Sequence, residues 1–140
     1  MYMRKNPPVL LIDDDPFALT LAKQIVKQLV QDSQIKTFSS AKAALSYLEA
    51  ENKVISPRQA GSGFILSDVR MPEINGFEFL DEFARLPRVI RDSYKVFMLS
   101  SMIDPEELQR LYGNECFSGF YPKPLTVEGL EILLKQAGFK

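Results

Sequence analysis

The sequence predicts an α/β fold, a doubly wound sheet of five parallel strands with five helices on its two faces. Five short apolar stretches typical of buried strands alternate with five stretches in which apolar residues recur at helical spacing. Alternation of this kind forms a parallel sheet, because each helix returns the chain in a right-handed crossover. The expected strands are 9–12, 34–38, 64–67, 94–99 and 119–121.

The first strand, 9–12, is a continuous apolar run, as expected of a strand buried on both faces. Asp15 and Pro16 follow as the N-cap and first residue of a helix, because an aspartate accepts from free backbone N–H groups and proline needs no donor there. The second strand leads into a helix that Ser39 or Ser40 caps.

The second half of the chain repeats this pattern. Residues 52–63 contain proline and glycine without any period, which predicts a surface loop. The third helix follows a turn at 75–76. Asp104 is expected to cap the fourth helix, with Glu107 at the position of a capping box, and Thr126 to cap the fifth.

Composition excludes several classes of function. A chain of 140 residues with 46% hydrophobic residues has the size and composition of one globular domain. Its net charge of −1 gives no attraction to nucleic acid or to a membrane surface, and no apolar run approaches the roughly 20 residues of a membrane span. The absence of histidine excludes imidazole catalysis and histidine metal ligands. The single cysteine, Cys116, fits a reducing compartment, and we expect the protein in the cytoplasm.

Polar side chains of complementary kinds follow four of the five expected strands. In open parallel sheets, ligands bind beyond the carboxyl ends of the strands, so these side chains are expected to meet. Each of them alone also has an ordinary explanation as a helix cap or a turn residue, and only their joint position indicates a site. They are Asp13, Asp14 and Asp15 after the first strand, Asp68 after the third, Ser100 and Ser101 after the fourth, and Lys123 after the fifth.

Several carboxylates that meet in one place repel one another unless a cation lies among them. A hard divalent ion with oxygen ligands meets this need, and Mg²⁺ is the expected one. An aspartate can itself attack phosphorus and form an aspartyl phosphate, while a lysine and a hydroxyl bind phosphoryl oxygens. The sequence therefore predicts a magnesium-dependent site for phosphoryl transfer.

Four stretches of this chain together resemble the receiver domains of response regulators in two-component signalling. They are VLLIDDDP at 9–16, SDVRMPEING at 67–76, MLSS at 98–101 and GFYPKP at 119–124. The resemblance runs from about residue 8 to the end of the chain and implies a flavodoxin-like sheet of order 2-1-3-4-5. It also implies one receiver domain over 1–140, with a core of about 8–138, of the type that stands alone without an output domain.

The resemblance implies a role for each site residue. Asp68 would be the phosphorylated residue, and Phe120 would be the switch aromatic. Ser100 and Lys123 would contact the phosphoryl group. The Mg²⁺ ligands would be Asp13, Asp14, Asp68 and the main-chain carbonyl of Arg70. It also implies a cis bond between Lys123 and Pro124.

The resemblance further implies a signalling switch rather than an enzyme, with only slow self-phosphorylation and self-dephosphorylation. The usual phosphodonor is a phosphohistidine, and this chain has no histidine. The donor must therefore be a partner, a histidine kinase or a histidine phosphotransfer protein, for which the first helix is a plausible docking element. Phosphorylation would alter the face formed by the fourth helix, the fifth strand and the fifth helix, which would bind a downstream protein or a second copy of the chain, and not DNA.

Two alternatives remain open from the residues. A small Mg²⁺-dependent phosphatase of the haloacid dehalogenase type also uses an aspartyl phosphate, and Asp13 and Asp15 form an Asp-x-Asp pair. That class has its nucleophile on the first strand, which would leave Asp68 unexplained. A phosphorylation-independent scaffold would have no need for the complete set of acids, hydroxyl and lysine.

Overall fold

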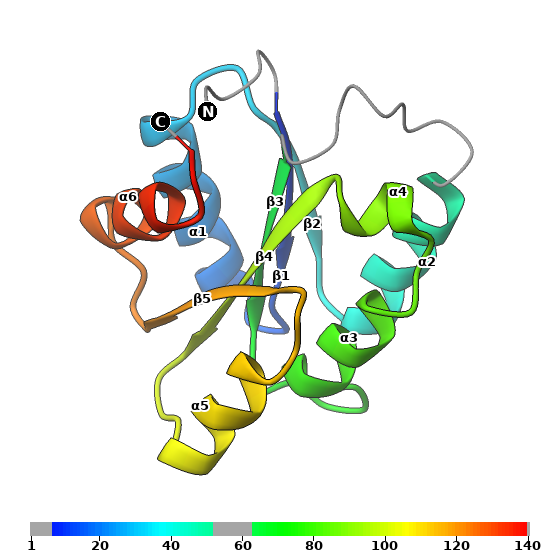
Figure 1. Ribbon diagram of the computed structural model, residues 1–140. Coiled ribbons are helices and arrows are strands. Elements are labelled where there is room, and N and C mark those ends of the chain that lie inside the picture. The colour runs from blue at the N-terminus through cyan, green and yellow to red at the C-terminus, as the bar shows by residue number, and fades with distance from the viewer. Residues whose placement is uncertain (1–6, 52–62, 140) are drawn as a thin grey trace.

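Five parallel strands form one sheet in the order β2-β1-β3-β4-β5 in the computed structural model, which describes residues 7–51 and 63–139 (Figure 1). This order confirms the prediction. The strands are β1 (Pro8–Ile12), β2 (Gln34–Phe38), β3 (Gly63–Asp68), β4 (Tyr94–Ser100) and β5 (Phe117–Pro122). The helices are α1 (Pro16–Leu29), α2 (Ala41–Glu51), α3 (Gly76–Phe83), α4 (Arg88–Arg91), α5 (Pro105–Tyr112) and α6 (Val127–Gln136).

The described part of the chain has six helices where the sequence predicted five. The additional helix, α4, is a single turn that follows Pro87 and leads into β4. Four residues are too few to show a helical period. The fully buried Ile90 and the partly buried Val89 anchor the turn to the core. The predicted fourth and fifth helices are therefore α5 and α6. The expected loop 52–63 lies outside the described residues, except that Gly63 begins β3.

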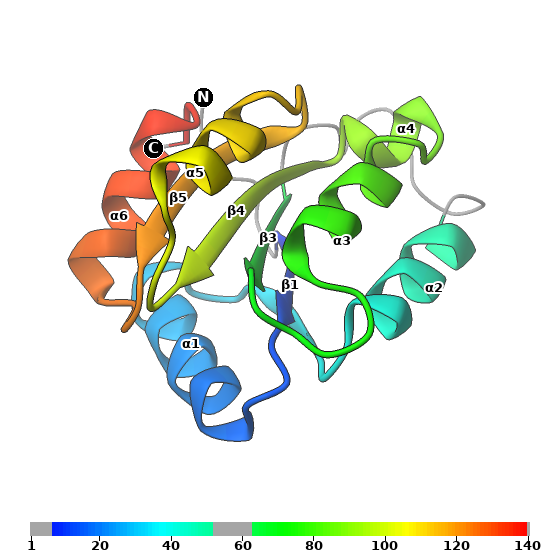
Figure 2. The ribbon, with the colours of Figure 1, turned by 90° about the horizontal axis from the view of Figure 1, so that it is seen from below.

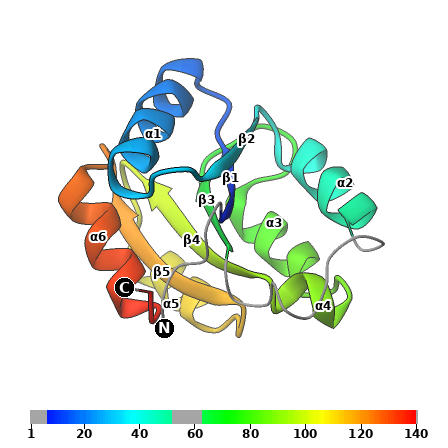
Figure 3. The same ribbon diagram turned by 90° about the horizontal axis from the view of Figure 1, so that it is seen from above.

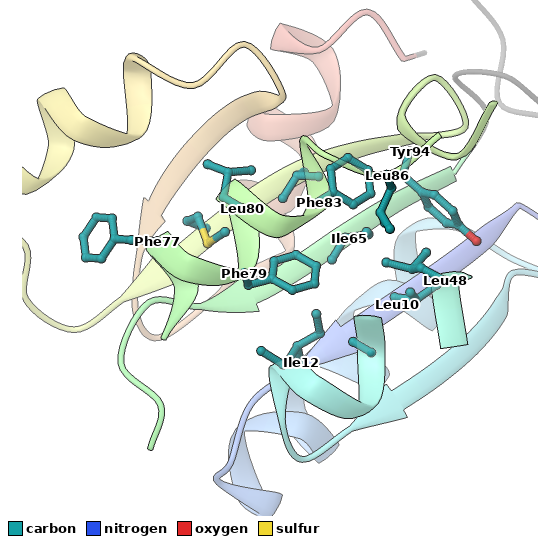
Figure 4. Close-up of a cluster of buried hydrophobic side chains, with 14 of the residues drawn as sticks. Leu10, Ile12, Leu48, Ile65, Phe77, Phe79, Leu80, Phe83, Leu86 and Tyr94 are labelled. Carbon is teal, nitrogen blue, oxygen red and sulfur yellow. The ribbon is translucent and has the colours of Figure 1, made fainter. Parts of the chain in front are cut away.

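The helices cover both faces of the sheet, as the views from below and from above show (Figures 2 and 3). On one face, α2, α3, α4 and α5 contribute to a core cluster that includes Leu10 and Ile12 of β1 (Figure 4). On the other face, α1 and α6 pack on a second cluster that includes Val9 and Leu11. Successive residues of β1 thus point to opposite faces, and residues 9–12 are all buried, as the continuous apolar run predicted.

Side-chain caps fix where five helices begin, close to the carboxyl ends of the strands. Each predicted cap is present, and Ser40 rather than Ser39 accepts from the backbone of α2. The capping residues are Asp15 for α1, Ser40 for α2, Asn75 with Glu78 for α3, Asp104 with Glu107 for α5, and Thr126 for α6. The loops between strand ends and caps are therefore short and held at both ends.

Gly76 offers a test of how tightly one of these loops is packed. A Cβ at Gly76 would lie 2.8 Å from the carbonyl oxygen of Asp68 and from Cα of Val69, both backbone atoms. We predict that Gly76→Ala lowers the free energy of unfolding by about 1–3 kcal/mol, measured by urea denaturation. The control is Gly113→Ala, where the Cβ would lie an ordinary 3.4 Å from the Arg110 carbonyl oxygen. An equal loss of stability in the two variants would contradict this account.

Candidate functional site

The carboxyl ends of β1 and β3 bring three aspartates together. The two strands are adjacent and parallel, with Ile12 paired to Ser67, so Asp13 and Asp68 follow at the same level of the sheet. One carboxylate oxygen from each of Asp13, Asp14 and Asp68 lies within 4.8 Å of the others. Asp13 and Asp68 are buried, at 6% and 7% exposure, whereas Asp14 is exposed. Asp15 does not belong to this cluster and serves as the N-cap of α1.

Lys123, in the loop after β5, reaches both buried carboxylates. Its Nζ lies 2.6 Å from Oδ2 of Asp13 and 3.4 Å from Oδ2 of Asp68. Its backbone N–H donates to the carbonyl oxygen of Ser100 at 2.9 Å, which fastens the loop to the end of β4. The bond between Lys123 and Pro124 is cis, as the resemblance implied.

The remaining oxygens of the two buried carboxylates are bound by backbone N–H groups. Oδ1 of Asp13 accepts from the N–H of Asp15 at 2.9 Å, and Oδ1 of Asp68 accepts from the N–H of Arg70 at 3.3 Å. Both carboxylates are therefore held in defined orientations, and the longer of the two bonds belongs to Asp68.

Burial and charge shift the pKa values at this site. Burial raises the pKa of Asp68 above its ordinary value and the charge of Asp13 raises it further, while Lys123 and the backbone N–H of Arg70 lower it without cancelling the rise. Burial by itself would lower the pKa of Lys123, but the hydrogen bond and charge of Asp13, together with the charge of Asp68, outweigh it and leave that pKa raised. Lys123 therefore stays protonated at neutral pH, while ionised Asp68 is held at a cost to stability.

Ser100 is fully buried at the end of β4, the strand beside β3. Its hydroxyl donates to the carbonyl oxygen of Met102 at 2.6 Å and accepts from the N–H of Met102 at 3.2 Å. The hydroxyl is thus engaged with its own loop in this structure. Phe120 is paired with Met98 in β5, is partly buried, and packs against the core cluster shown in Figure 4.

No pattern in the sequence indicates the contacts that the Arg70 side chain makes. The guanidinium forms two bonds of 2.6 Å with the carboxylate of Glu107 in α5, and a third of 3.2 Å with the carbonyl oxygen of Met102. Sequence reasoning assigned the main-chain carbonyl of Arg70 to the metal and named no partner for its side chain. The pair is separated by 37 residues, and no local pattern could have signalled it.

A cavity of about 400 Å³ adjoins the acidic site between α1 and the loop after β5. Its lining is largely apolar, and it includes Asp13 and Lys123 at the end nearest the site. Phe17 and Leu21 of α1 also line it and are 85% and 42% exposed. An apolar surface of this kind, open to solvent beside a polar centre, is typical of a binding surface.

The acidic cluster fits the metal that the resemblance implies. All three side chains offer carboxylate oxygens, which are the ligands that Mg²⁺ prefers, and an exposed third acid leaves room for water and for a phosphate group. The donors include no sulfur or nitrogen, so the cluster is suited to a hard ion rather than to a transition metal.

Fold and site together define a class: a flavodoxin-like α/β domain with an acidic, metal-competent centre at the carboxyl ends of its strands. Comparison with known proteins identifies the family. Residues 9–135 match the response regulator receiver domain, and the chain belongs to this family.

Solved structures of receiver proteins resemble this chain over nearly its full length. The response regulator receiver protein of Dyadobacter fermentans is 30% identical, with a TM-score of 0.77 and coverage of 95% of this chain and 98% of that one. A two-component response regulator of Cytophaga hutchinsonii is 28% identical, with a TM-score of 0.81 and coverage of 96% and 98%. Among curated proteins, the probable methanogenesis regulatory protein FilR2 of Methanothrix harundinacea is 27% identical over 88% of this chain and 76% of its own length.

Receiver domains are signalling switches of two-component systems, and they work with histidine kinases or phosphotransfer partners. The family binds Mg²⁺, in agreement with the acidic cluster. The phosphatase alternative is not favoured, because the match to receiver domains runs through the whole core. In the described part of the chain, no helix combines the length and apolar character needed to cross a membrane.

The raised pKa of Asp68 predicts that its charge weakens the folded state when no divalent cation is present. Asp68→Asn should raise the free energy of unfolding by on the order of 1 kcal/mol at neutral pH, measured by denaturation in EDTA. Because the folded-state pKa lies above the ordinary 3.8, this advantage should be absent below pH 3.8 and grow as pH rises through the folded-state pKa of Asp68.

The control for this measurement is Asp15→Asn, since asparagine caps a helix as well as aspartate does. A wild-type protein as stable as Asp68→Asn at neutral pH would show that the buried carboxylate carries no such cost.

Proposed function

We propose that Asp68 accepts a phosphoryl group in a Mg²⁺-dependent reaction and that this chain is the phospho-acceptor of a two-component phosphorelay. The observation that carries the proposal is the meeting of Asp13, Asp14 and Asp68 around one point, with Lys123 bonded to the two buried members. Residues of about 8–138 would form the core of this one receiver domain.

The proposed metal ligands are Asp13, Asp14, Asp68 and the main-chain carbonyl of Arg70. When bound, Mg²⁺ offsets the negative charge of the carboxylates and of the incoming phosphoryl group. An Asp68 carboxylate oxygen attacks phosphorus and forms the new P–O bond, while the P–N bond to the donor imidazole breaks. Asp68 is suited to this role because it is buried and oriented by a backbone N–H. Its raised pKa also makes the ionised carboxylate more basic than that of an ordinary aspartate, and therefore a better nucleophile.

Lys123 supplies a positive charge that would change its partner when Asp68 is phosphorylated. In the unphosphorylated protein its ammonium is bonded to Asp13 and lies 3.4 Å from Asp68. A phosphoryl group on Asp68 adds about −1.5 to −2 charge, so a phosphoryl oxygen becomes the stronger partner for the ammonium. Lys123 then stabilises the charge that develops during transfer.

Ser100 and Phe120 would transmit the change to the α5–β5–α6 face. The Ser100 hydroxyl is bound to Met102, and turning it toward a phosphoryl oxygen would break both of those bonds. Such a change would release the loop that leads into α5 and make space for the partly buried ring of Phe120. The altered face would bind a downstream protein or a second copy of the chain.

The donor would be a histidine kinase or a histidine phosphotransfer protein, because this chain lacks histidine. The apolar cavity beside the site supports α1 as part of the docking surface, with Phe17 and Leu21 exposed at it. The proposal places the domain in the cytoplasm, a reducing compartment with which the single cysteine is consistent.

Incubation with acetyl phosphate and Mg²⁺, followed by intact mass measurement, tests the proposed function. The wild-type mass should rise by one phosphoryl group, and Asp68→Ala and an EDTA control should show no increase. Lys123→Met should slow the reaction by on the order of tenfold or more, because a preorganised charge is lost.

Asp15→Asn is the matched control in the same loop as the acid pair and should be labelled like the wild type. Labelling of Asp68→Ala would contradict the assignment of the acceptor. A wild type that takes up no phosphate would favour the scaffold alternative, and repeated turnover of a generic phosphate ester would favour the phosphatase.

A further inference from the structure

The Arg70 guanidinium lies between two loops that border the acidic site. The backbone N–H of Arg70 donates to Oδ1 of Asp68 at 3.3 Å, so its side chain starts at the proposed acceptor. The guanidinium donates at 3.2 Å to the Met102 carbonyl oxygen, which also accepts from the Ser100 hydroxyl at 2.6 Å. The guanidinium and the hydroxyl proposed to bind the phosphoryl group therefore share one acceptor.

Glu107 holds the guanidinium in this position. Its two carboxylate oxygens each accept one bond of 2.6 Å from Arg70, the geometry in which a guanidinium binds a carboxylate best. Oε1 also accepts from the N–H of Asp104 at 3.2 Å, which completes the capping box of α5. Glu107 thus belongs at once to the first turn of α5 and to the contact that holds Arg70.

Charge determines which partner the guanidinium prefers. Side-chain exposures of 51% for Arg70 and 24% for Glu107 mean that water weakens this ion pair. A phosphoryl group carries about −1.5 to −2 charge and three acceptor oxygens, against one charge on the carboxylate. A phosphorylated Asp68, two residues from Arg70 in the chain, is accordingly a strong competitor for the guanidinium.

We propose that Glu107 is a positioning residue that withholds the Arg70 guanidinium from the phosphoryl group, and that phosphorylated Asp68 competes with Glu107 for it. The proposal rests on the function proposed for Asp68. Its consequence is that the first turn of α5 loses its contact with the loop after β3 when the guanidinium moves. The ion pair then couples the phosphorylation site to the α5–β5–α6 face by a second route, which shares only the Met102 carbonyl oxygen with the route through Ser100.

Glu107→Gln is the direct test, because glutamine can still accept from the N–H of Asp104 and preserve the capping box. The rate of phosphorylation by acetyl phosphate with Mg²⁺ would be measured by intact mass over a series of acetyl phosphate concentrations. The rate at low concentration should rise about twofold to fivefold, the range that an exposed ion pair supplies, through a lower half-saturation concentration. The freed guanidinium would attract the anionic donor without altering the maximal rate.

Glu106→Gln is the matched control, since it removes the same charge from the same turn of α5 and Glu106 is exposed. This variant should keep the wild-type concentration dependence. The effect of Glu107→Gln must also vanish when Arg70 is replaced by methionine, so the double variant should equal Arg70→Met alone. Thermal melting of each variant verifies folding, and Arg70→Met alone should lower the rate at low concentration.

The outcomes separate the two proposals. If the wild type is labelled but Glu107→Gln and Glu106→Gln behave alike, the inference about Glu107 fails and the proposed function stands. An effect of Glu107→Gln that persists without Arg70 would also overturn it, as would an Arg70→Met variant indistinguishable from the wild type. If the wild type is not labelled, the proposed function itself fails.

Discussion

The contact on which the site depends is the ammonium of Lys123 between the carboxylates of Asp13 and Asp68. Two buried carboxylates at neighbouring strand ends would repel each other, and an unpaired one would be costly to ionise. Lys123 follows β5, and in the observed strand order it must reach across the ends of β4 and β3 to meet Asp13 after β1. One residue thereby joins the carboxyl ends of four strands, since its ammonium contacts the acids after β1 and β3 and its backbone N–H contacts the end of β4.

The same contact explains how the site can serve as a switch. The lysine compensates the acids in part, since the pKa of Asp68 remains raised in its presence. The negative charge that Lys123 does not compensate favours the binding of a divalent cation, which in the proposed reaction would also bind the phosphoryl group. In the proposed mechanism, a phosphoryl group on Asp68 would change the partners of Lys123, Ser100 and Arg70.

Much of this arrangement could be predicted from the sequence because it follows from local patterns. Continuous apolar runs marked the buried strands, and capping residues such as Asp15 and Asp104 marked where helices begin. The parallel sheet then required that Asp13 and Asp68 meet, since residues at the carboxyl ends of adjacent strands lie at one edge. The strand order itself came from the family resemblance, and the structure confirms it.

What the sequence could not predict depends on contacts between distant residues or on very short elements. The α4 turn is too short to have a period, and its formation depends on the burial of Ile90. The ion pair of Arg70 with Glu107 joins the loop after β3 to the first turn of α5, two segments that only the folded sheet brings together. Tertiary packing likewise determines which rotamer the Ser100 side chain adopts, and this rotamer directs the hydroxyl toward Met102.

The response of thermal stability to Mg²⁺ tests most directly whether these carboxylates form a metal-binding centre. An ion that binds only the folded state stabilises it by RT ln(1 + [L]/Kd), so the melting temperature of the unphosphorylated protein should rise with Mg²⁺ concentration. The rise should exceed that produced by NaCl of equal ionic strength and should be largely lost in Asp13→Asn. A melting temperature that Mg²⁺ does not change, or that changes equally in Asp13→Asn, would contradict the account.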